Sequence, residues 1–376
     1  RWFAARVAEL IRSASPEDLA LINRQAEREL EAALNPKQAA GLRRFVTRYS
    51  GHPLAEKALR AMVDATAEGV RPLETGFALL RLRRSPDDAT AAFATAKLAA
   101  LAIDFDRYAD AAGYLKDLRT IWGDTLIWDN KTGRELVASW SEDPLVSRRL
   151  GGKSPWPLGR VDVNDEKKAT PTRAIGQPVD LLEVRERQSP PLTLEWSPPK
   201  DTSSVTLIAR SGDTKPVWSI EVPTGAGGRI NFNSYARACG DLTVIMSGNE
   251  ILAIDALGWR SGTGGDDSQT PSGQVLWRRY LDGPYPRPAS ASRSNSAWGV
   301  DSRGRRMGEL GPVTPRGVFY QSGRSLFAAD PMTGETLWQR GGIEHNSRLF
   351  ADDDRLMVVS REGKTAAYYS MIDGRE

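Results

Sequence analysis

Side chains that commonly carry catalysis or hold metals are scarce in this sequence of 376 residues, which has one cysteine and two histidines. The single Cys239 excludes an internal disulfide, and it precedes an apolar run at 242–246, which indicates a small buried thiol. His52 and His345 lie nearly the whole chain apart, so a zinc site of cysteine and histidine ligands cannot be assembled. A serine–histidine–aspartate triad would depend on one isolated histidine. We expect His52 at the start of a helix and His345 in a surface loop.

Long apolar runs and a strong excess of one charge are also absent. No stretch of about 18 consecutive apolar residues occurs, so no transmembrane helix is predicted, which leaves peripheral membrane association open. The net charge is only +3, and the arginine clusters at 81–84 and 303–306 have no aromatic residues interleaved with them. Such clusters are typical of solvated faces or loops, so we expect no nucleic-acid partner.

What the sequence does contain is a repeat. Residues 248–255 read GNEILAID and residues 323–330 read GRSLFAAD, and each copy is followed by a turn and a tryptophan. A third copy begins at Gly363, and both Gly323 to Gly363 and Gly334 to Gly374 are intervals of 40 residues. The residues that mark the repeat are Gly248, Asp255, Gly273, Trp277, Gly323, Asp330, Gly334, Trp338, Gly363 and Gly374. A period near 40 with short β-prone runs is typical of a four-stranded propeller blade.

Each marked residue type has a physical role in such a blade. The apolar run suits a strand buried between neighbouring sheets, and Asp330 can accept hydrogen bonds from the following turn. Gly334 supplies a positive φ, and Trp338 returns as a large plate between blades. A weaker copy is formed by residues 207–210 with Trp218, where Arg210 replaces the aspartate.

The order glycine, apolar run, aspartate, Thr-Gly-Glu and tryptophan, best seen at 323–338, resembles the repeat of the PQQ-like (pyrroloquinoline-quinone-type) β-propellers. That family includes quinoprotein alcohol dehydrogenases and the non-enzymatic BamB-like scaffold of outer-membrane protein assembly. The resemblance covers about the last half of the chain, and its signature residues are structural. Two features depart from the pattern: a polar insertion between Asp255 and Trp277, and an arginine-rich stretch between Trp277 and Gly311.

The first 140 residues are rich in Ala, Leu, Arg and Glu, with apolar residues at helical spacing. Residues 69–74 can be laid over 105–110 at a spacing of 36, which places Arg71 on Arg107 and resembles the tetratricopeptide period of about 34. An ordinary helical bundle is the alternative. The segment 129–135 mimics a blade turn but is expected to be a loop between helices.

A proline-dense segment follows the helical region, and proline at this density favours extended or linker structure. Within it, residues 158–164 and 179–184 are candidates for single strands, and 192–196 for the first strand of the β region. We therefore predict a multidomain α plus β protein. It has a helical tetratricopeptide-like domain at 1–140, a linker at 141–191 and incomplete PQQ-like propeller blades at 192–376. The chain starts without methionine and stops before the tryptophan of its third copy, so we expect part of a longer product, with fewer blades than a closed ring of ~4–8.

Two functions fit these features. The first is a non-catalytic scaffold that binds a protein or peptide, without catalytic residues, metal or cofactor, and the BamB-like resemblance places it in the cell envelope or periplasm. The second is a quinoprotein dehydrogenase or ligand-binding propeller. The resemblance implies that such an enzyme needs a vicinal cysteine pair and a set of metal ligands, whereas this sequence has only Cys239. The sequence favours the scaffold.

Overall fold

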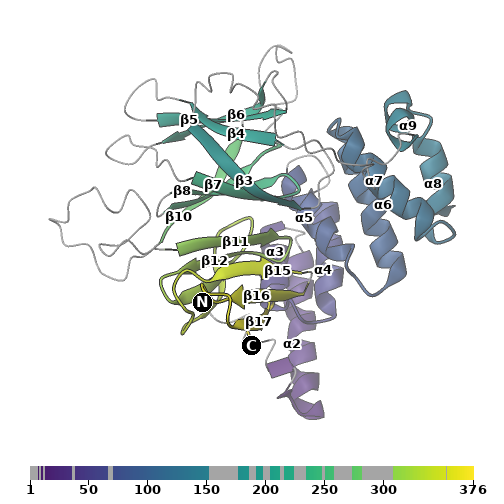
Figure 1. Cartoon of the computed structure of the whole chain (residues 1–376). Helices are drawn as coiled ribbons and strands as arrows, with labels where there is room; N and C mark the ends of the chain where they lie inside the picture. Colours follow the sequence, from purple (N-terminus) through teal and green to yellow (C-terminus); the bar gives the residue numbers. More distant parts are fainter. Residues whose placement is uncertain are drawn as a thin grey trace.

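The computed structural model has an α-helical N-terminal part followed by β-sheets (Figure 1). The residues it describes are 7, 10–11, 13–35, 39–66, 71–151, 177–185, 192–197, 204–211, 216–223, 234–247, 250–257, 273–281, 308–352 and 354–376.

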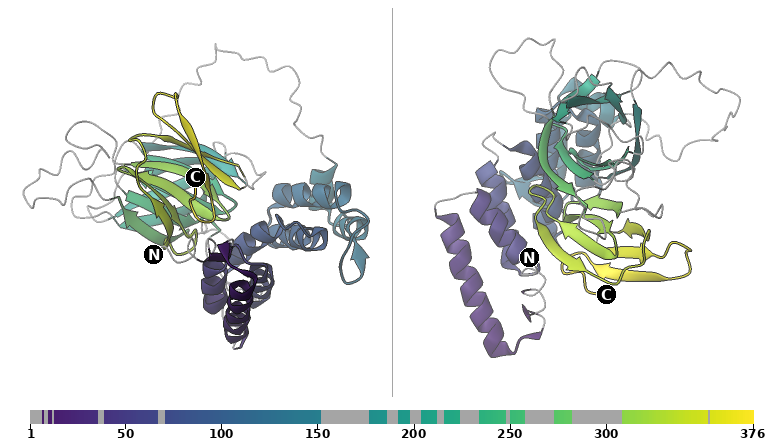
Figure 2. Two further views of the ribbon diagram at one scale, coloured as in Figure 1. Left: turned by 90° about the horizontal axis from the view of Figure 1, so that it is seen from below. Right: turned by 90° about the vertical axis from the view of Figure 1, so that its left-hand side faces the viewer.

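The helices form a chain of neighbours in which each packs against the next along the sequence from α2 to α7. They are α2 (Pro16–Leu34), α3 (Ala39–Arg48), α4 (Leu54–Thr66), α5 (Pro72–Leu82), α6 (Asp88–Asp104), α7 (Tyr108–Thr120), α8 (Gly133–Trp140) and α9 (Pro144–Leu150). Ser15 caps α2 by accepting a hydrogen bond from the Asp18 amide, and Pro16 occupies the first helical turn, where a missing N–H is harmless. Figure 2 shows α6–α9 projecting away from the sheets, while α2–α5 lie beside them.

A β-hairpin lies between helices α7 and α8. We had expected only a loop at 129–135. Strands β1 (Leu126–Trp128) and β2 (Lys131–Thr132) pair antiparallel across Asp129 and Asn130, whose φ angles are 52° and 56°. Two successive positive φ angles define the turn type that fits a two-residue hairpin. Thr132 and Glu135 then form a capping box at the start of α8. Helices also continue past residue 140, as far as Leu150.

The first β-sheet has eight strands in the order β10-β9-β8-β7-β3-β4-β5-β6. They are β3 (Gln177–Arg185), β4 (Leu192–Ser197), β5 (Ser204–Ser211), β6 (Pro216–Pro223), β7 (Ser234–Cys239), β8 (Leu242–Ser247), β9 (Glu250–Asp255) and β10 (Gln274–Tyr280). Strand β3 lies inside the segment 141–191, so part of the predicted linker belongs to this sheet, while the candidate strand at 158–164 lies outside the described residues. Because β3 pairs antiparallel with β4 and parallel with β7, two runs of four strands are joined along it.

Two further sheets follow, and both are simple antiparallel meanders. The first has the order β11 (Gly308–Thr314), β12 (Gly317–Ser322), β13 (Ser325–Ala329) and β14 (Thr336–Arg340). The second has β15 (Arg348–Ala351), β16 (Arg355–Val359) and β17 (Ala366–Ser370). The first strands of successive runs lie next to one another, since β7 contacts β3 and β11, and β11 contacts β15. This is the arrangement of blades in part of a β-propeller.

Three apolar clusters lie between successive runs of strands. One joins β3–β6 to one face of β7–β9, a second joins the opposite face of β7–β10 to β11–β13, and a third joins β12–β14 to β15–β17. The middle strands β8 and β12 are therefore covered on both faces, and all but the last residue of each is buried. This explains why their sequences are continuous apolar runs rather than alternating patterns.

The helices and the sheets share a core. The cluster between β7–β10 and β11–β13 also contains residues of α2–α6, among them Leu79 and Leu80 of α5. An ion pair lies at the same boundary: Arg107, at the start of α7, binds the carboxylate of Asp241 in the β7–β8 turn. Asp110 lies 4.0 Å from the Arg107 guanidinium, and the Arg107 and Asp241 side chains are only 16% and 11% exposed. The helical part is thus held to the sheets by apolar packing and by a largely buried charge cluster.

We expect Arg107→Ala to lower the free energy of unfolding by about 3–5 kcal/mol, because it leaves two buried carboxylates without their shared cation. Arg134→Ala is the matched control, since Arg134 pairs with Asp124 at 3.0 Å and both side chains are mostly exposed, 65% and 83%. Exposed pairs contribute only ~0–1 kcal/mol. Chemical denaturation of both variants measures the difference, and equal losses would contradict a stabilising role for the pair at the boundary.

Candidate functional site

The three tryptophans of the repeat lie at the same position in successive runs of strands. Trp218 lies on β6, Trp277 on β10 and Trp338 on β14, in each case opposite an alanine of the preceding strand. These alanines are Ala209, Ala253 and Ala328. A β-bulge adjoins each tryptophan pairing, and in the last of them Ala328 lies opposite Trp338 while Ala329 lies opposite Thr336.

Trp277 and Trp338 each reach the turn of the following sheet. The Trp277 indole Nε1 donates to the Pro331 carbonyl at 2.8 Å, and the Trp338 Nε1 donates to the Met371 carbonyl at 2.8 Å. A Cβ at Gly334 would lie 2.7 Å from the Trp277 ring, and a Cβ at Gly374 would lie 2.5 Å from the Trp338 ring. The two contacts are equivalent, and in both the ring occupies the space that a side chain at the glycine would need.

The turns that receive the tryptophans are built alike. The Asp330 Oδ1 accepts hydrogen bonds from the amides of Met332 and Thr333, both at 2.9 Å, and the Gly334 amide donates to the Asp330 carbonyl at 2.8 Å. In the next copy Ser370 takes the place of the aspartate, and the Gly374 amide donates to its carbonyl at 2.8 Å.

The remaining marked residues follow the repeat less closely. Asp255 Oδ1 accepts from the Leu257 amide at 2.9 Å, and the Gly273 amide donates to the Ser219 carbonyl at 2.9 Å. Gly273 is not among the glycines with positive φ, whereas Gly323 and Gly363 have φ angles of 58° and 72° in open surroundings. Gly248 lies outside the described residues.

We expect Trp338→Ala to lower the free energy of unfolding by ~3–5 kcal/mol, because the side chain is 1% exposed and leaves a cavity between two sheets. Tyr368→Ala in the neighbouring sheet removes another large aromatic ring, but one that is 53% exposed, and should change stability by no more than about 0.5 kcal/mol. Chemical denaturation compares them, and a Trp338 loss as small as that of Tyr368 would refute the docking contact.

Alanine substitutions at four glycines separate backbone strain from collision with tryptophan. All four have positive φ, where a side chain costs roughly 1–2 kcal/mol. Gly334→Ala and Gly374→Ala should be more destabilising than Gly323→Ala and Gly363→Ala, because only the first pair places a Cβ against an indole ring. Melting temperatures of the four variants test this order, and equal decreases would show that φ alone requires glycine.

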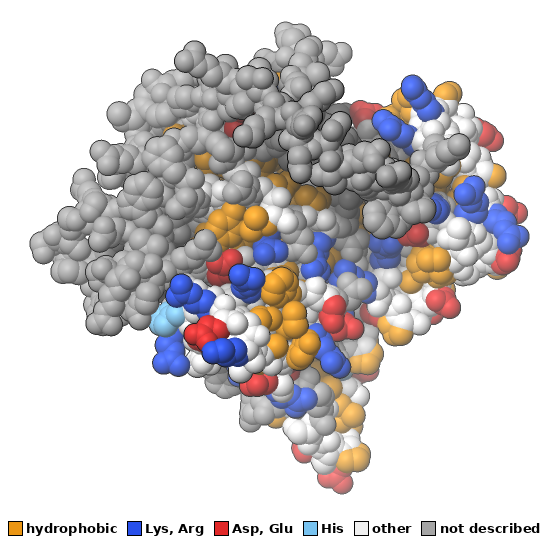
Figure 3. Space-filling model, viewed as in Figure 1, with side chains coloured by type: hydrophobic (Ala, Val, Ile, Leu, Met, Phe, Trp, Pro, Cys, Tyr) orange, Lys and Arg blue, Asp and Glu red, His pale blue; other side chains and the backbone are white. Residues whose placement is uncertain are grey.

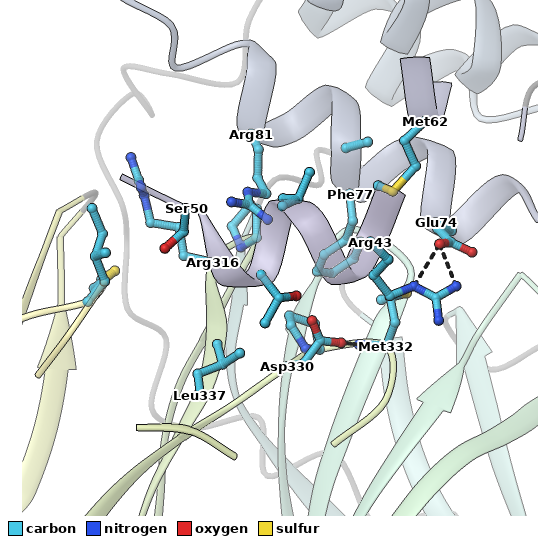
Figure 4. Close-up of a pocket in the computed structure, with 17 residues that line it drawn as sticks. Arg43, Ser50, Met62, Glu74, Phe77, Arg81, Arg316, Asp330, Met332 and Leu337 are labelled. Atoms are coloured by element: carbon cyan, nitrogen blue, oxygen red, sulfur yellow. Dashed lines mark hydrogen bonds and ion pairs between the residues drawn. The ribbon is translucent and has the colours of Figure 1, made fainter. Parts of the chain in front are cut away.

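A pocket lies where helices α3–α5 meet the turns of the last two sheets (Figure 4). Phe77 and Arg81 of α5 line it from the helical side, and Arg316, Asp330 and Met332 line it from the sheets. Its volume is about 60 Å³.

A wider cleft of about 390 Å³ adjoins this pocket. The two share Arg43, Thr47, Asp330 and Leu337 among their lining residues. Helix α3 forms one wall of the cleft, and the turn between β13 and β14 forms the other. We call the two together the junction cleft.

The arginines of the junction cleft differ in their partners. Arg43 donates from Nε to the buried Glu74 carboxylate at 2.8 Å, and Arg316 lies 3.5 Å from Asp354. For the Arg81 side chain, the described residues offer no hydrogen bond and no ion pair within 4 Å. Its burial, reinforced by the positive charge of Arg316 and opposed by Asp330, lowers the pKa of Arg81 to about 10. Arg81 therefore remains a cation at neutral pH, in surroundings that disfavour its charge.

The arginine cluster at 81–84 was expected to be solvated, but its Arg81 and Arg83 side chains are partly buried. Arg81 is half-buried in the pocket, and Arg83 pairs with Asp117 at 2.6 Å. The cluster at 303–306 lies outside the described residues. The sequence did contain a signal that Arg81 faces the protein interior. It follows the buried Phe77 by four residues and so lies on the same face of α5.

The two histidines and the cysteine lie in separate parts of the chain. His52 is buried before α4, where its Nδ1 accepts from the Leu54 amide at 3.1 Å, and burial lowers its pKa. Cys239 is a buried thiol outside any disulfide, and His345 lies between β14 and β15. Among the described residues, no group of three or more His, Cys, Asp or Glu side chains is placed to hold a metal ion. None of the helices described here has the length and apolar character needed to cross a membrane.

On the face shown in Figure 3, the described Lys and Arg side chains are interspersed with Asp and Glu. Hydrophobic side chains are visible between them, and Phe350 and Tyr368 of the last sheet are exposed.

The fold is thus part of a β-propeller with a helical part packed on it. No protein-family model and no curated protein matches the sequence. Among solved structures, the chain is similar to BamB from Moraxella catarrhalis, with 16% identity, 53% of this chain and 51% of that chain covered, and a TM-score of 0.32. It is also similar to the Cps50 (Swd1) β-propeller domain from Myceliophteria thermophila, with 12% identity, coverage of 51% and 53%, and a TM-score of 0.28. The chain spans about half the length of each, and similarities at this level say nothing about what it binds or does.

Proposed function

We propose that this protein is a non-catalytic interaction scaffold that binds a peptide segment of another protein in the junction cleft. The observation that carries the proposal is that the cleft is built from both parts of the chain: α3 and α5 supply one wall and the β13–β14 turn supplies the other. Clefts between packed units, with apolar walls and a few polar groups, are the usual position of binding sites.

The proposal includes the assignment of the sheets to the PQQ-like β-propellers. The PQQ-like repeat is supported by the equivalent contacts of Trp277 and Trp338 with Gly334 and Gly374. We keep the division into a helical domain at 1–140, a linker at 141–191 and propeller blades at 192–376, with two changes: the helices extend to Leu150, and β3 belongs to the first sheet.

The tetratricopeptide-like reading of the helices is supported by two corresponding pairs. Arg71 precedes α5 at the N-cap position and lies 3.4 Å from Glu74, and Arg107 precedes α7 at the same position and lies 4.0 Å from Asp110. Both acidic residues are buried, and the pairs are 36 residues apart, as the sequence alignment within this region requires. Stacked helical pairs of this kind present extended surfaces to peptides.

The BamB-like resemblance of the repeat adds a biological setting to the proposal. We place the scaffold in the cell envelope or periplasm, where it takes part in outer-membrane protein assembly by holding a partner segment. The repeat residues serve in this proposal as structural groups, and neither a quinone nor a metal is assigned to them.

The test is selection of binding peptides from an unbiased display library on the full chain. Ala40→Trp places a large ring at the mouth of the junction cleft, where Ala40 is exposed, and should abolish binding of the selected peptides. Ala138→Trp is the matched control, because it makes the same change at an exposed alanine of α8, away from the cleft. Peptides that bind both variants as tightly as the wild type would refute the junction cleft as the site.

A further inference from the structure

We propose that the pocket at the inner end of the junction cleft is a carboxylate subsite, in which Arg81 and Arg316 receive an acidic side chain of the bound peptide. This inference rests on the proposed peptide-binding function and adds the chemistry of the ligand. It would make acidic residues a requirement for the partner segment.

The geometry of the two arginines supports an anion between them. Arg81 comes from α5 and Arg316 from the turn between β11 and β12, and Figure 4 shows their side chains close together at one end of the pocket. Two adjacent cations repel each other, and Arg81 has no ion pair within the described part of the chain. An incoming carboxylate would relieve both effects, since guanidinium groups bind carboxylates through paired, charge-assisted hydrogen bonds.

Asp330, an acidic residue of the pocket lining whose charge acts on Arg81, already accepts hydrogen bonds from its own turn. Its Oδ1 accepts from the Met332 and Thr333 amides at 2.9 Å and from the Thr333 hydroxyl at 3.2 Å. These bonds hold the carboxylate at the turn, and Asp330 remains outside the 4 Å distance of an ion pair with Arg81. Glu74 is likewise committed to Arg43, at 2.8 Å.

The size of the pocket selects the ligand group. A volume of about 60 Å³ admits only a few water-sized groups, which suits a carboxylate and is too small for a nucleotide. The apolar side chains of Phe77, Met332 and Leu337 line the same space. They lower the local polarity and strengthen the attraction between a carboxylate and the arginines. The wider cleft outside leaves room for the peptide backbone that carries the acidic side chain.

A first measurement asks whether Arg81 is a binding group or a structural one. Arg81→Met keeps a long side chain but removes a desolvated charge beside Arg316, so we expect a higher melting temperature than that of the wild type. Arg361→Met, at an exposed arginine in the turn between β16 and β17, should leave the melting temperature unchanged. A lower melting temperature for Arg81→Met would show that the cation stabilises the fold, and it would overturn the proposal.

A second measurement tests binding on the full chain. The probe is a fluorescent peptide of alternating glutamate and serine, and its control is the same peptide with glutamine in place of every glutamate. We expect anisotropy titrations to show binding of the acidic peptide, weakened about tenfold or more by Arg81→Met or Arg316→Met and unaffected by Arg361→Met. Arg81→Lys, which keeps the charge but not the paired donors, should give an intermediate affinity.

Other outcomes of this titration overturn the subsite. Two results would mean that the pocket does not recognise a carboxylate specifically. One is equal affinity for the two peptides, and the other is a loss of affinity with Arg361→Met as large as that with Arg81→Met. Stronger displacement of the probe by inorganic phosphate than by acetate, at equal ionic strength, would assign the arginines to phosphate. If neither peptide bound while library peptides still required an open cleft at Ala40, the subsite would be wrong and the peptide-binding function would stand. If the library peptides failed as well, the proposed function would be wrong.

Discussion

The packing of an indole ring against a glycine of the next sheet is the contact on which the arrangement of the last three sheets depends. Sheets of apolar strands can slide over one another, because the hydrophobic effect has no direction. The Trp277 and Trp338 rings remove this freedom, since each donates one hydrogen bond to a fixed carbonyl and fits only where a side chain is missing. Because Trp277 and Trp338 occupy the same strand position, they set the same offset between neighbouring sheets. Trp218 shares the strand position, but its Nε1 has no hydrogen-bond partner among the described residues. Its run of strands, β3–β6, is instead joined to the next run by the pairing of β3 with β7.

The turn at 330–334 links this packing to the candidate site. Its Pro331 carbonyl receives the Trp277 indole, and Asp330 and Met332 of the same turn line the pocket against α5. The position of the pocket wall is thus fixed by a contact made on the other side of the turn. The shared apolar core and the Arg107 ion pair with Asp241 fix the opposite, helical wall. A cleft between two walls that are each held by buried contacts is largely formed before a ligand arrives, so little binding energy is spent on ordering it.

The sequence predicted those parts of the structure that depend on neighbours in the chain. Helical spacing, the cap at Ser15 and the repeat from Gly323 to Trp338 are local patterns, and the helices, the capped start of α2 and strands β13 and β14 follow from them. The parallel pairing of β3 with β7 was not predictable, because it joins residues about 55 apart with no turn between them, and only the tendency of 179–184 to be extended could be read. The pocket was missed for a similar reason. Arg81 and Arg316 are 235 positions apart in the sequence, and a cluster of arginines at 81–84 looks the same whether its first member faces water or a cavity.

Three arginines at the boundary between helices and sheets differ in whether the protein supplies a carboxylate partner, and this difference separates structural from binding roles. Arg43 and Arg107 each have a buried carboxylate within reach, so their charges are compensated inside the protein and hold two segments together. Arg81 lies at the same boundary, yet the Asp330 carboxylate is held by its own turn, and the positive charge of Arg316 acts against that of Arg81. Stability alone would favour an apolar residue at this half-buried position, because a partly desolvated charge without an ion pair is unfavourable. A charge where packing would favour none is the pattern expected of a group whose partner comes from outside the chain.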